Sequence, residues 1–228
     1  MKKQKIAVLT GAGISAESGL KTFRDANGLW EGHDVMSVAS PEGWRANQEL
    51  VLEFYNQRRA QLLNVTPNAA HKALVDLEKE YEVNIITQNV DDLHERAGSS
   101  KVMHLHGELL KVRCTQDESD VMEWKKDLVM GDLSHKQHQL RPHIVWFGEM
   151  VPLLEPAAQL VSEADYILII GTSMQVYPAA GLVDYAKVGA QIYFIDPKPA
   201  IAQQKNLKVF AEKATTGVPK VVKQLLED

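Results

Sequence analysis

Short, almost uninterrupted apolar runs recur along the chain, and polar segments or segments with helical spacing separate them. The runs lie at Lys5–Thr10, Asn84–Gln88, Val102–Leu105, Tyr166–Ile170 and Gln191–Ile195. A strand that is apolar on both faces is typical of a parallel sheet that helices cover on each side. The pattern therefore predicts an α/β fold in which these runs are the strands of one parallel sheet.

Three segments carry helical patterns. Thr66-Pro67 precedes Asn68–Glu80, and a hydroxyl cap followed by proline is typical of a helix start. This helix has an apolar stripe of Ala70, Ala73, Leu74 and Leu77. The spacing also predicts a helix at Gln48–Leu63 and a closing helix at Val218–Leu226.

Two stretches interrupt the alternation of strands and helices. Residues 32–65 carry a helical pattern but no predicted strand, and residues 114–140 are rich in Asp, Glu, Lys and His. We expect these two insertions to form a small second domain. Residues 1–31, 66–113 and 141–228 then form a larger, Rossmann-like domain with helices on both faces of its parallel sheet.

A glycine-rich turn, Gly11-Ala12-Gly13-Ile14-Ser15, directly follows the first run. Such a turn lets backbone N–H groups approach a phosphate, so it indicates a dinucleotide site. Ala16 replaces the third glycine of the usual G-x-G-x-x-G pattern, and no second strand ending in an acid follows. These departures argue against an ordinary dehydrogenase, and a purely structural turn remains the alternative for this motif taken alone.

Three predicted strands end in polar, loop-like sequences. These are Thr10-Gly11-Ala12-Gly13, Thr87-Gln88-Asn89-Val90-Asp91 and Gly171-Thr172-Ser173. Ligands of open α/β sheets bind beyond the carboxyl ends of the strands. We therefore expect all three segments to line one crevice.

His106 lies beyond the end of another predicted strand, in His104-Leu105-His106-Gly107. A histidine in such a place is suited to act as a general base near neutral pH. The alternative is a histidine that is hydrogen-bonded for packing. His104 lies two positions earlier and would share the same face of a strand, so periodicity does not choose between the two.

Composition sets the broad class of this 228-residue chain. Its 45% hydrophobic and 24% charged residues are typical of a globular protein, and a net charge of −5 gives no basic footprint for sequence-specific nucleic-acid binding. One cysteine excludes an internal disulfide framework and suits a reducing compartment. The apolar runs are too short for a membrane span or a signal peptide. We expect a monomeric, cytoplasmic protein without a membrane partner.

Six motifs in one order cover nearly the whole length. They are Gly11-Ala12-Gly13-Ile14-Ser15, Thr22-Phe23-Arg24-Asp25, Thr87-Gln88-Asn89-Val90-Asp91, His104-Leu105-His106-Gly107, Val145-Trp146-Phe147-Gly148-Glu149 and Gly171-Thr172-Ser173. With them the chain resembles the sirtuin family of NAD-dependent protein deacylases. The resemblance implies NAD as the cofactor, acylated-lysine proteins or peptides as partners, and nicotinamide, O-acyl-ADP-ribose and free lysine as products.

Carried over position by position, the resemblance also implies roles. His106 matches the catalytic base, which selects it over His104, and Asn89 and Asp91 would position the reacting groups. The implied cofactor-binding residues are Gly11, Ala12, Gly13, Ser15, Glu17, Phe23, Arg24, Trp30, Gln88, Asn89, Val90, Asp91, Gly171, Thr172, Ser173, Asp196 and Ala214. Two strand-like edges would hold the substrate peptide by main-chain hydrogen bonds: Val145, Trp146, Phe147, Gly148 and Glu149, and Met174, Gln175 and Val176.

Tyr55 and Arg58 bear on the acyl group, because residues three apart share a helix face. A phenol beside a guanidinium suits a carboxylate. The pair, with the small residue Ala39, resembles sirtuins that remove succinyl, malonyl or glutaryl groups. We therefore expect a desuccinylase and demalonylase that also removes acetyl groups. An exposed helix face is the alternative.

The chain departs from the many sirtuins that hold zinc with two Cys-x-x-Cys pairs. Only Cys114 is a thiol here, and Asp117 occupies the second position. A mixed site of Cys114, Asp117, His135 and His138 is the alternative, because such residues ligate zinc, but we expect no metal. Two other functions also stay open: mono-ADP-ribosyl transfer, and a non-catalytic NAD-sensing module.

Overall fold

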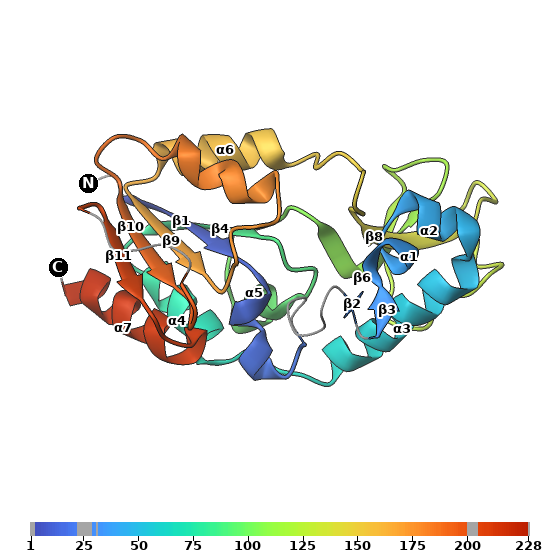
Figure 1. Ribbon diagram of the computed structural model, residues 1–228, viewed down its shortest axis with the longest axis horizontal. Coiled ribbons are helices and arrows are strands. Elements are labelled where there is room, and N and C mark those ends of the chain that lie inside the picture. The colour runs from blue at the N-terminus through green and yellow to red at the C-terminus, as the bar shows by residue number, and fades with distance from the viewer. Residues whose placement is uncertain (1–2, 22–28, 31, 200–204, 228) are drawn as a thin grey trace.

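The computed structural model describes residues 3–21, 29–30, 32–199 and 205–227, and it consists of a larger and a smaller unit side by side (Figure 1). The larger unit holds a parallel sheet of six strands in the order β11-β10-β9-β1-β4-β5. The strands are β1 Lys5–Thr10, β4 Glu82–Thr87, β5 Val102–His104, β9 Tyr166–Ile170, β10 Gln191–Ile195 and β11 Leu207–Phe210. The predicted α/β fold with one parallel sheet is confirmed.

The strand order places a crevice at the carboxyl end of β1. From β1 the chain builds outward to β4 and β5 on one side, and to β9, β10 and β11 on the other. Val8 of β1 lies opposite Ile85 of β4 and Leu168 of β9, so the three strands end together. Connections diverge from this point of the sheet, and ligands of open α/β sheets bind there.

Helices cover both faces of the sheet (Figure 1). α4 (Ala69–Leu77) and α7 (Ala214–Glu227) bury apolar side chains against one face, in a cluster that includes Val8 and Leu168. α6 (Leu154–Glu163) and the 3₁₀ helix η4 (Ala179–Tyr185) cover the opposite face. Two 3₁₀ turns follow β1, η1 (Ala12–Ile14) and η2 (Ala16–Ser18), and α5 (Leu93–Ala97) follows the β4 turn.

The boundaries of two helices, α4 and α7, differ from the prediction. Asn68, and not Thr66, caps α4: its side chain accepts a hydrogen bond from the Ala70 N–H at 2.9 Å and donates to the Ile14 carbonyl at 2.8 Å. The carboxamide thus satisfies both the helix start and the glycine-rich turn, which a threonine hydroxyl cannot do from position 66. α4 also ends three residues early, at Leu77, and α7 begins four residues early, at Ala214. The helix expected at Gln48–Leu63 is confirmed as α3 with the same bounds.

The smaller unit combines short helices with an antiparallel sheet. Its elements are α1 Val35–Val38, α2 Pro41–Ala46, α3, the sheet strands β6 Gly107–Cys114, β7 Val121–Glu123 and β8 Leu140–Ile144, and the hairpin β2 Leu29–Trp30 with β3 His33–Asp34. The expectation that residues 32–65 hold no strand is therefore wrong, because β3 lies there. A two-residue hairpin strand is too short to show periodicity.

Strands β6 and β8 share a core with the smaller unit. Leu109, Val112 and Leu140 from these strands pack in one apolar cluster with Leu52 and Leu62 of α3. From the sequence, most of β6 and most of β8 were expected in the larger domain. From this packing we propose that the second segment of the smaller unit runs from 107 to 144 instead of 114 to 140. No described helix is long and apolar enough to cross a membrane.

Candidate active site

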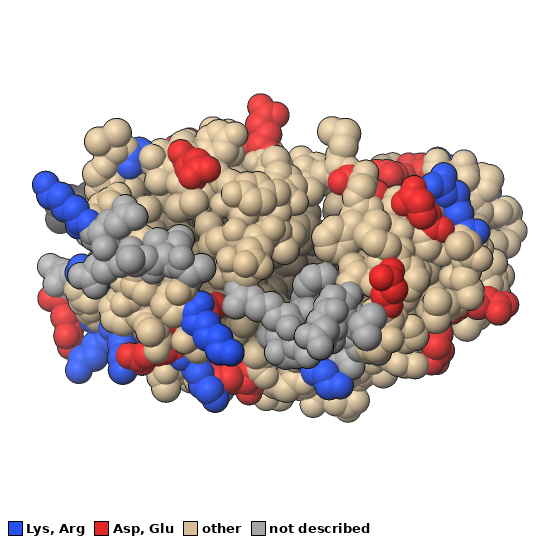
Figure 2. Space-filling view, in the orientation of Figure 1, with Lys and Arg blue, Asp and Glu red and all other residues tan. Residues whose placement is uncertain are grey.

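A cavity of about 980 Å³ opens at the carboxyl ends of the central strands and extends to the smaller unit. Figure 2 shows the surface hollowed between the two units. Gly11, Gln88, Gly171 and Asp196, which line the cavity, are each the first residue after β1, β4, β9 and β10. The sheet topology thus brings the three polar segments at the strand ends to one crevice, as the sequence predicts.

Most of the predicted site residues line this cavity. Of the cofactor-binding set, Phe23 and Arg24 lie outside the described residues, and the structure places the others in the lining: Gly11, Ala12, Gly13, Ser15, Glu17, Trp30, Gln88, Asn89, Val90, Asp91, Gly171, Thr172, Ser173, Asp196 and Ala214. His106 lines it as well. Of the substrate-binding set, the lining includes Ala39, Tyr55, Arg58, Val145, Trp146, Phe147, Gly148, Glu149 and Val176, but not Met174 and Gln175.

The glycine-rich turn after β1 packs directly against the turn after β9. The Gly13 N–H donates to the Gly171 carbonyl at 2.8 Å, and a Cβ on Gly13 would lie 2.6 Å from the Gly171 Cα. Gly171 has φ +60, in the left-handed region that favours glycine. These glycines therefore line the cavity and also allow two backbone segments to meet, so the ligand-binding and structural interpretations of the motif are compatible.

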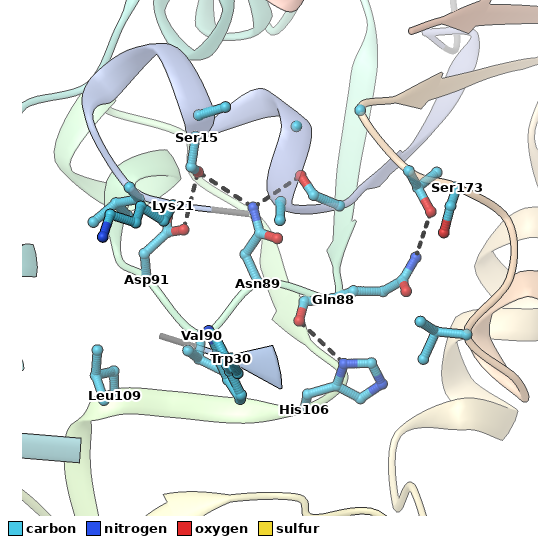
Figure 3. A pocket seen from close by; sticks show the side chains of 18 of the residues that line it. Ser15, Lys21, Trp30, Gln88, Asn89, Val90, Asp91, His106, Leu109 and Ser173 are labelled. Atoms are coloured by element: carbon cyan, nitrogen blue, oxygen red, sulfur yellow. Dashed lines mark hydrogen bonds between the residues drawn. The ribbon is translucent and has the colours of Figure 1, made fainter. Parts of the chain in front are cut away.

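Ser15 and Asn89 connect the glycine-rich turn to the segment after β4 (Figure 3). The Ser15 hydroxyl donates to Asp91 Oδ2 at 2.9 Å, and the Asn89 Nδ2 donates to the Gly11 carbonyl at 3.1 Å. Burial raises the pKa of the Asp91 carboxyl to about 6, and the hydrogen bond from Ser15 opposes this rise. A carboxyl group that changes charge near neutral pH thus lies beside the amide of Asn89.

His106 faces the cavity with one ring nitrogen occupied (Figure 3). Its Nδ1 lies 3.1 Å from the Gln88 carbonyl oxygen, which only accepts, so Nδ1 carries the hydrogen. The Nε2 atom of the neutral ring is then a proton acceptor. Burial lowers the pKa of His106, although the Gln88 hydrogen bond opposes this, and the neutral form is favoured.

His104 has a different environment. Strand β5 ends at His104, so His106 lies beyond it. The two histidines therefore do not lie on one face of a strand, as they would if the strand continued to His106. The His104 Nε2 lies 2.7 Å from Glu95 Oε1, and its Nδ1 lies 3.0 Å from the Asn89 carbonyl oxygen. Burial lowers the pKa of His104, but the bonds to Glu95 outweigh this, and the net direction is upward. His104 therefore supports the backbone of Asn89, and it does not line the cavity.

Two acids, Glu17 and Asp196, line the cavity in the larger unit. Glu17 Oε2 accepts hydrogen bonds from the Thr215 N–H at 3.1 Å and the Thr215 hydroxyl at 2.6 Å, which fixes the start of α7 beside the glycine-rich turn. Asp196, buried after β10, accepts from the Lys198 N–H at 2.8 Å. In the usual dinucleotide-binding pattern, the strand that follows the glycine-rich turn ends in an acid. Here the acid at a strand end is Asp196, which follows β10.

The opposite end of the cavity lies in the smaller unit, against α3. Tyr55 is fully buried, and its hydroxyl oxygen accepts a hydrogen bond from the Trp146 indole at 3.0 Å. The Arg58 guanidinium carbon lies 4.4 Å from the centre of a Trp30 ring. This face of α3 therefore lines a cavity, and the alternative of an exposed helix face is wrong.

Residues 145–149 and 174–176 form no strand, although the sequence analysis expected strand-like edges. The first segment is nevertheless held by main-chain bonds: the Val145 N–H donates to the His106 carbonyl, and the Phe147 N–H to the Ala39 carbonyl, both at 2.9 Å. Met174 packs toward the core instead of lining the cavity.

The lining also includes four residues that were not predicted from the sequence: Gln61, Leu62, Lys198 and Lys213. They lie close along the chain to Arg58, Asp196 and Ala214, and this proximity is the one sequence signal that could have identified them.

The insert around Cys114 is held by hydrogen bonds and an ion pair. Asp117 accepts from the Lys136 ammonium and from the Ser119 hydroxyl, each at 2.6 Å. The Cys114 Sγ accepts from the Gln116 N–H at 3.4 Å. Among the described residues, no group of three or more His, Cys, Asp or Glu side chains is arranged to hold a metal ion. The mixed set of Cys114, Asp117, His135 and His138 is therefore not such a group either.

Comparisons with known proteins agree on one family. A model described as the Sir2 family matches residues 11–178. An NAD-dependent protein deacylase of Helicobacter pylori is 59% identical over 225 residues, which cover 98% of each chain. The crystal structure of a Sir2 homolog–NAD complex has a TM-score of 0.85 and 37% identity, covering 99% of this chain and 90% of that one. The structure of Sir2Af2 bound to a myristoylated histone peptide has a TM-score of 0.74 and 30% identity, covering 99% and 92%.

Proposed function

This chain belongs to the Sir2 family, and from that premise we propose that it is an NAD-dependent protein deacylase that removes succinyl and malonyl groups from lysine, and acetyl groups as well. One observation carries the acyl preference: Tyr55 and Arg58 lie in the lining of the same cavity as His106. A phenol and a guanidinium in the lining of a cavity match the terminal carboxylate of a dicarboxylic acyl group.

The donor set of the cavity fits NAD. The glycine-rich turn, beside Ser15, lets backbone groups come close to the phosphates of NAD. Near α7, the buried carboxylate of Asp196 can accept hydrogen bonds from ribose hydroxyls. Asn89 and Asp91, which are hydrogen-bonded to the glycine-rich turn, line the same cavity as His106. When bound there, NAD would supply an electrophilic ribose carbon with nicotinamide as its leaving group.

The chain's own residues bind, orient and move a proton. His106 Nε2 is free to take a proton, because its Nδ1–H is held by the Gln88 carbonyl. The Asn89 side chain is fixed by the Gly11 carbonyl and by Ser15, so it presents its remaining polar atoms in one orientation. Such orientation of the reacting groups lowers the activation free energy by an amount comparable to the contribution of the general base.

Arg58 and Tyr55 compensate for burying the acyl carboxylate. An ionised carboxylate taken out of water needs a partner charge and hydrogen bonds. The Arg58 guanidinium supplies the charge, and its contact with Trp30 orients its planar fork. Burial raises the pKa of the Tyr55 phenol, which keeps its hydrogen available for donation. Ala39 leaves room for the longer acyl chain.

We propose acylated-lysine proteins as the partners, with residues 145–149 along the peptide backbone. The relative Sir2Af2 binds a myristoylated histone peptide, which supports a peptide substrate for this chain. We also propose a monomeric working form, since Tyr55, Arg58 and His106 of a single chain line one cavity. The single cysteine supports a reducing, cytoplasmic compartment.

Mass spectrometry tests the proposal directly. Peptides with acetyl-, succinyl- and malonyl-lysine are incubated with the enzyme, with and without NAD, and the lysine product is quantified. We expect NAD-dependent removal of all three groups. We expect Arg58→Met to lower desuccinylation about 10- to 100-fold relative to deacetylation, because a charge-assisted hydrogen-bond pair is lost. Arg45→Met, on an exposed side chain paired with Glu42, is the charge-matched control. An equal loss on succinyl- and acetyl-lysine would contradict the role of Arg58.

The same incubation with labelled NAD separates the two alternative functions. Label that stays on protein would support ADP-ribosyl transfer, and label recovered in O-acyl-ADP-ribose supports deacylation. Nicotinamide release that requires an acylated peptide would exclude a module that only senses NAD.

A further inference from the structure

The indole of Trp146 links the loop after β8 to the acyl end of the cavity. Its Nε1 lies 3.0 Å from the hydroxyl oxygen of Tyr55 in α3, across 91 positions of the chain. Both side chains are almost completely buried, at 2% and 0% exposure, so no bulk water competes for this bond. Both side chains belong to the apolar cluster of the smaller unit, which holds the two groups of this bond in place.

The chemistry of the two groups fixes the direction of this hydrogen bond. An indole N–H only donates, so the Tyr55 oxygen is the acceptor. The hydroxyl of Tyr55 has a single hydrogen, which is repelled from the indole N–H and points to another partner. Arg58 lies one turn further along α3 and lines the same cavity.

We propose that Trp146 is a positioning residue for acyl selectivity: by donating to Tyr55, it directs the Tyr55 O–H toward the carboxylate of a succinyl or malonyl group that Arg58 binds. This inference rests on the proposed function. An acetyl group has no carboxylate at that end, so the orientation of the Tyr55 hydroxyl distinguishes acidic acyl groups from acetyl.

Trp146 is itself held on several sides. The Arg141 guanidinium carbon lies 3.3 Å from the centre of a Trp146 ring, and the backbone N–H of Trp146 donates to Glu149 Oε2 at 2.7 Å. Glu149 in turn pairs with Arg141 at 2.7 Å. Trp44 packs against the indole with ring centroids 5.7 Å apart. A donor restrained in this way costs little entropy when it orients a second side chain.

The test compares two Trp→Phe changes in one cluster. Trp146→Phe keeps an aromatic ring but removes the N–H, and Trp44→Phe makes the same change in its buried neighbour. We expect Trp146→Phe to lower the ratio of kcat/KM for succinyl-lysine over acetyl-lysine about tenfold, mainly through KM for the succinyl peptide. For Trp44→Phe we expect a ratio within about twofold of the wild type.

A second variant keeps the test informative if Trp146→Phe does not fold. Tyr55→Phe removes the hydroxyl that Trp146 would direct, and we expect the same fall in the ratio. The double variant should then show no further fall, because the two residues act through one bond. Equal ratios for Trp146→Phe and Trp44→Phe, or an unchanged ratio for Tyr55→Phe, would overturn the positioning role. If Arg58→Met also left the ratio unchanged, the proposed acyl preference itself would fail.

Discussion

The Nδ1 atom of His106 lies 3.1 Å from the carbonyl oxygen of Gln88, and this contact decides which ring nitrogen is available as a base. Because a carbonyl oxygen only accepts, the neutral ring carries its hydrogen on Nδ1 and leaves Nε2 open. Gln88 is the residue that follows β4, so the sheet itself sets the tautomer.

We expect His106→Tyr to lower deacylation by at least about 100-fold while NAD still binds, because a general base typically contributes 10²- to 10⁴-fold. Product formation and calorimetric NAD binding measure the two effects. Burial lowers the pKa of His106, so we also expect the wild-type base to stay neutral at pH 7. His135→Tyr, at an exposed position, is the control. Retained turnover in His106→Tyr would contradict the assignment.

Asp91→Asn tests the cost of a buried charge. Burial raises the pKa of Asp91 to about 6, above its ordinary value of 3.8, so its contribution to stability is present below about pH 4 and is lost as the pH rises through 6. We expect the variant to be more stable than the wild type by about 1–3 kcal/mol at pH 8, with no gain at pH 4. It should also lose activity. Urea unfolding at both pH values measures the difference, and a gain independent of pH would refute the explanation.

Gly13→Ala tests the contact between the two turns. Its Cβ would lie 2.6 Å from the Gly171 Cα, so backbone has to move. We expect the free energy of unfolding to fall by about 1–3 kcal/mol, together with weaker NAD binding. Gly181→Ala is the matched control, since the nearest atom to its Cβ is the Tyr177 Cε1 at 3.8 Å. Similar stability losses in both variants would show that the close contact is not the cause.

Glu149→Gln tests the buried ion pairs beneath the cavity edge. Glu149 pairs with Arg141 at 2.7 Å and with Arg113 at 3.3 Å, and both guanidinium groups are buried. Removing the carboxylate leaves two buried cations short of a counter-charge, so we expect a loss of about 2–4 kcal/mol in thermal or urea unfolding. Glu42→Gln breaks an exposed pair with Arg45 and should change stability by less than about 1 kcal/mol. Equal losses would contradict this account.

Local pattern was sufficient for several elements. Strands β1, β9 and β10 and helix α3 have the bounds that the sequence predicts. These strands are covered on both faces, so their apolar runs match the strands. The prediction Asn84–Gln88 is wrong for β4, which runs from Glu82 to Thr87. The sequence did not reveal β11, in which Lys208 interrupts the apolar run and lies over the Tyr193 ring. As an edge strand β11 pairs only with β10, which makes a lysine acceptable there.

The sequence by itself determined the parallel sheet and the polar residues beyond its strand ends, because both follow from burial and from chain order. The tertiary structure decided which histidine faces the cavity, since Glu95 of α5 binds His104 at the end of β5, whereas His106 lines the cavity. It also decided that Tyr55 meets Trp146. The Tyr55–Trp146 bond spans 91 positions of the chain, and the His104–Glu95 bond joins a strand to a helix. The periodicity of either element alone does not encode such a contact.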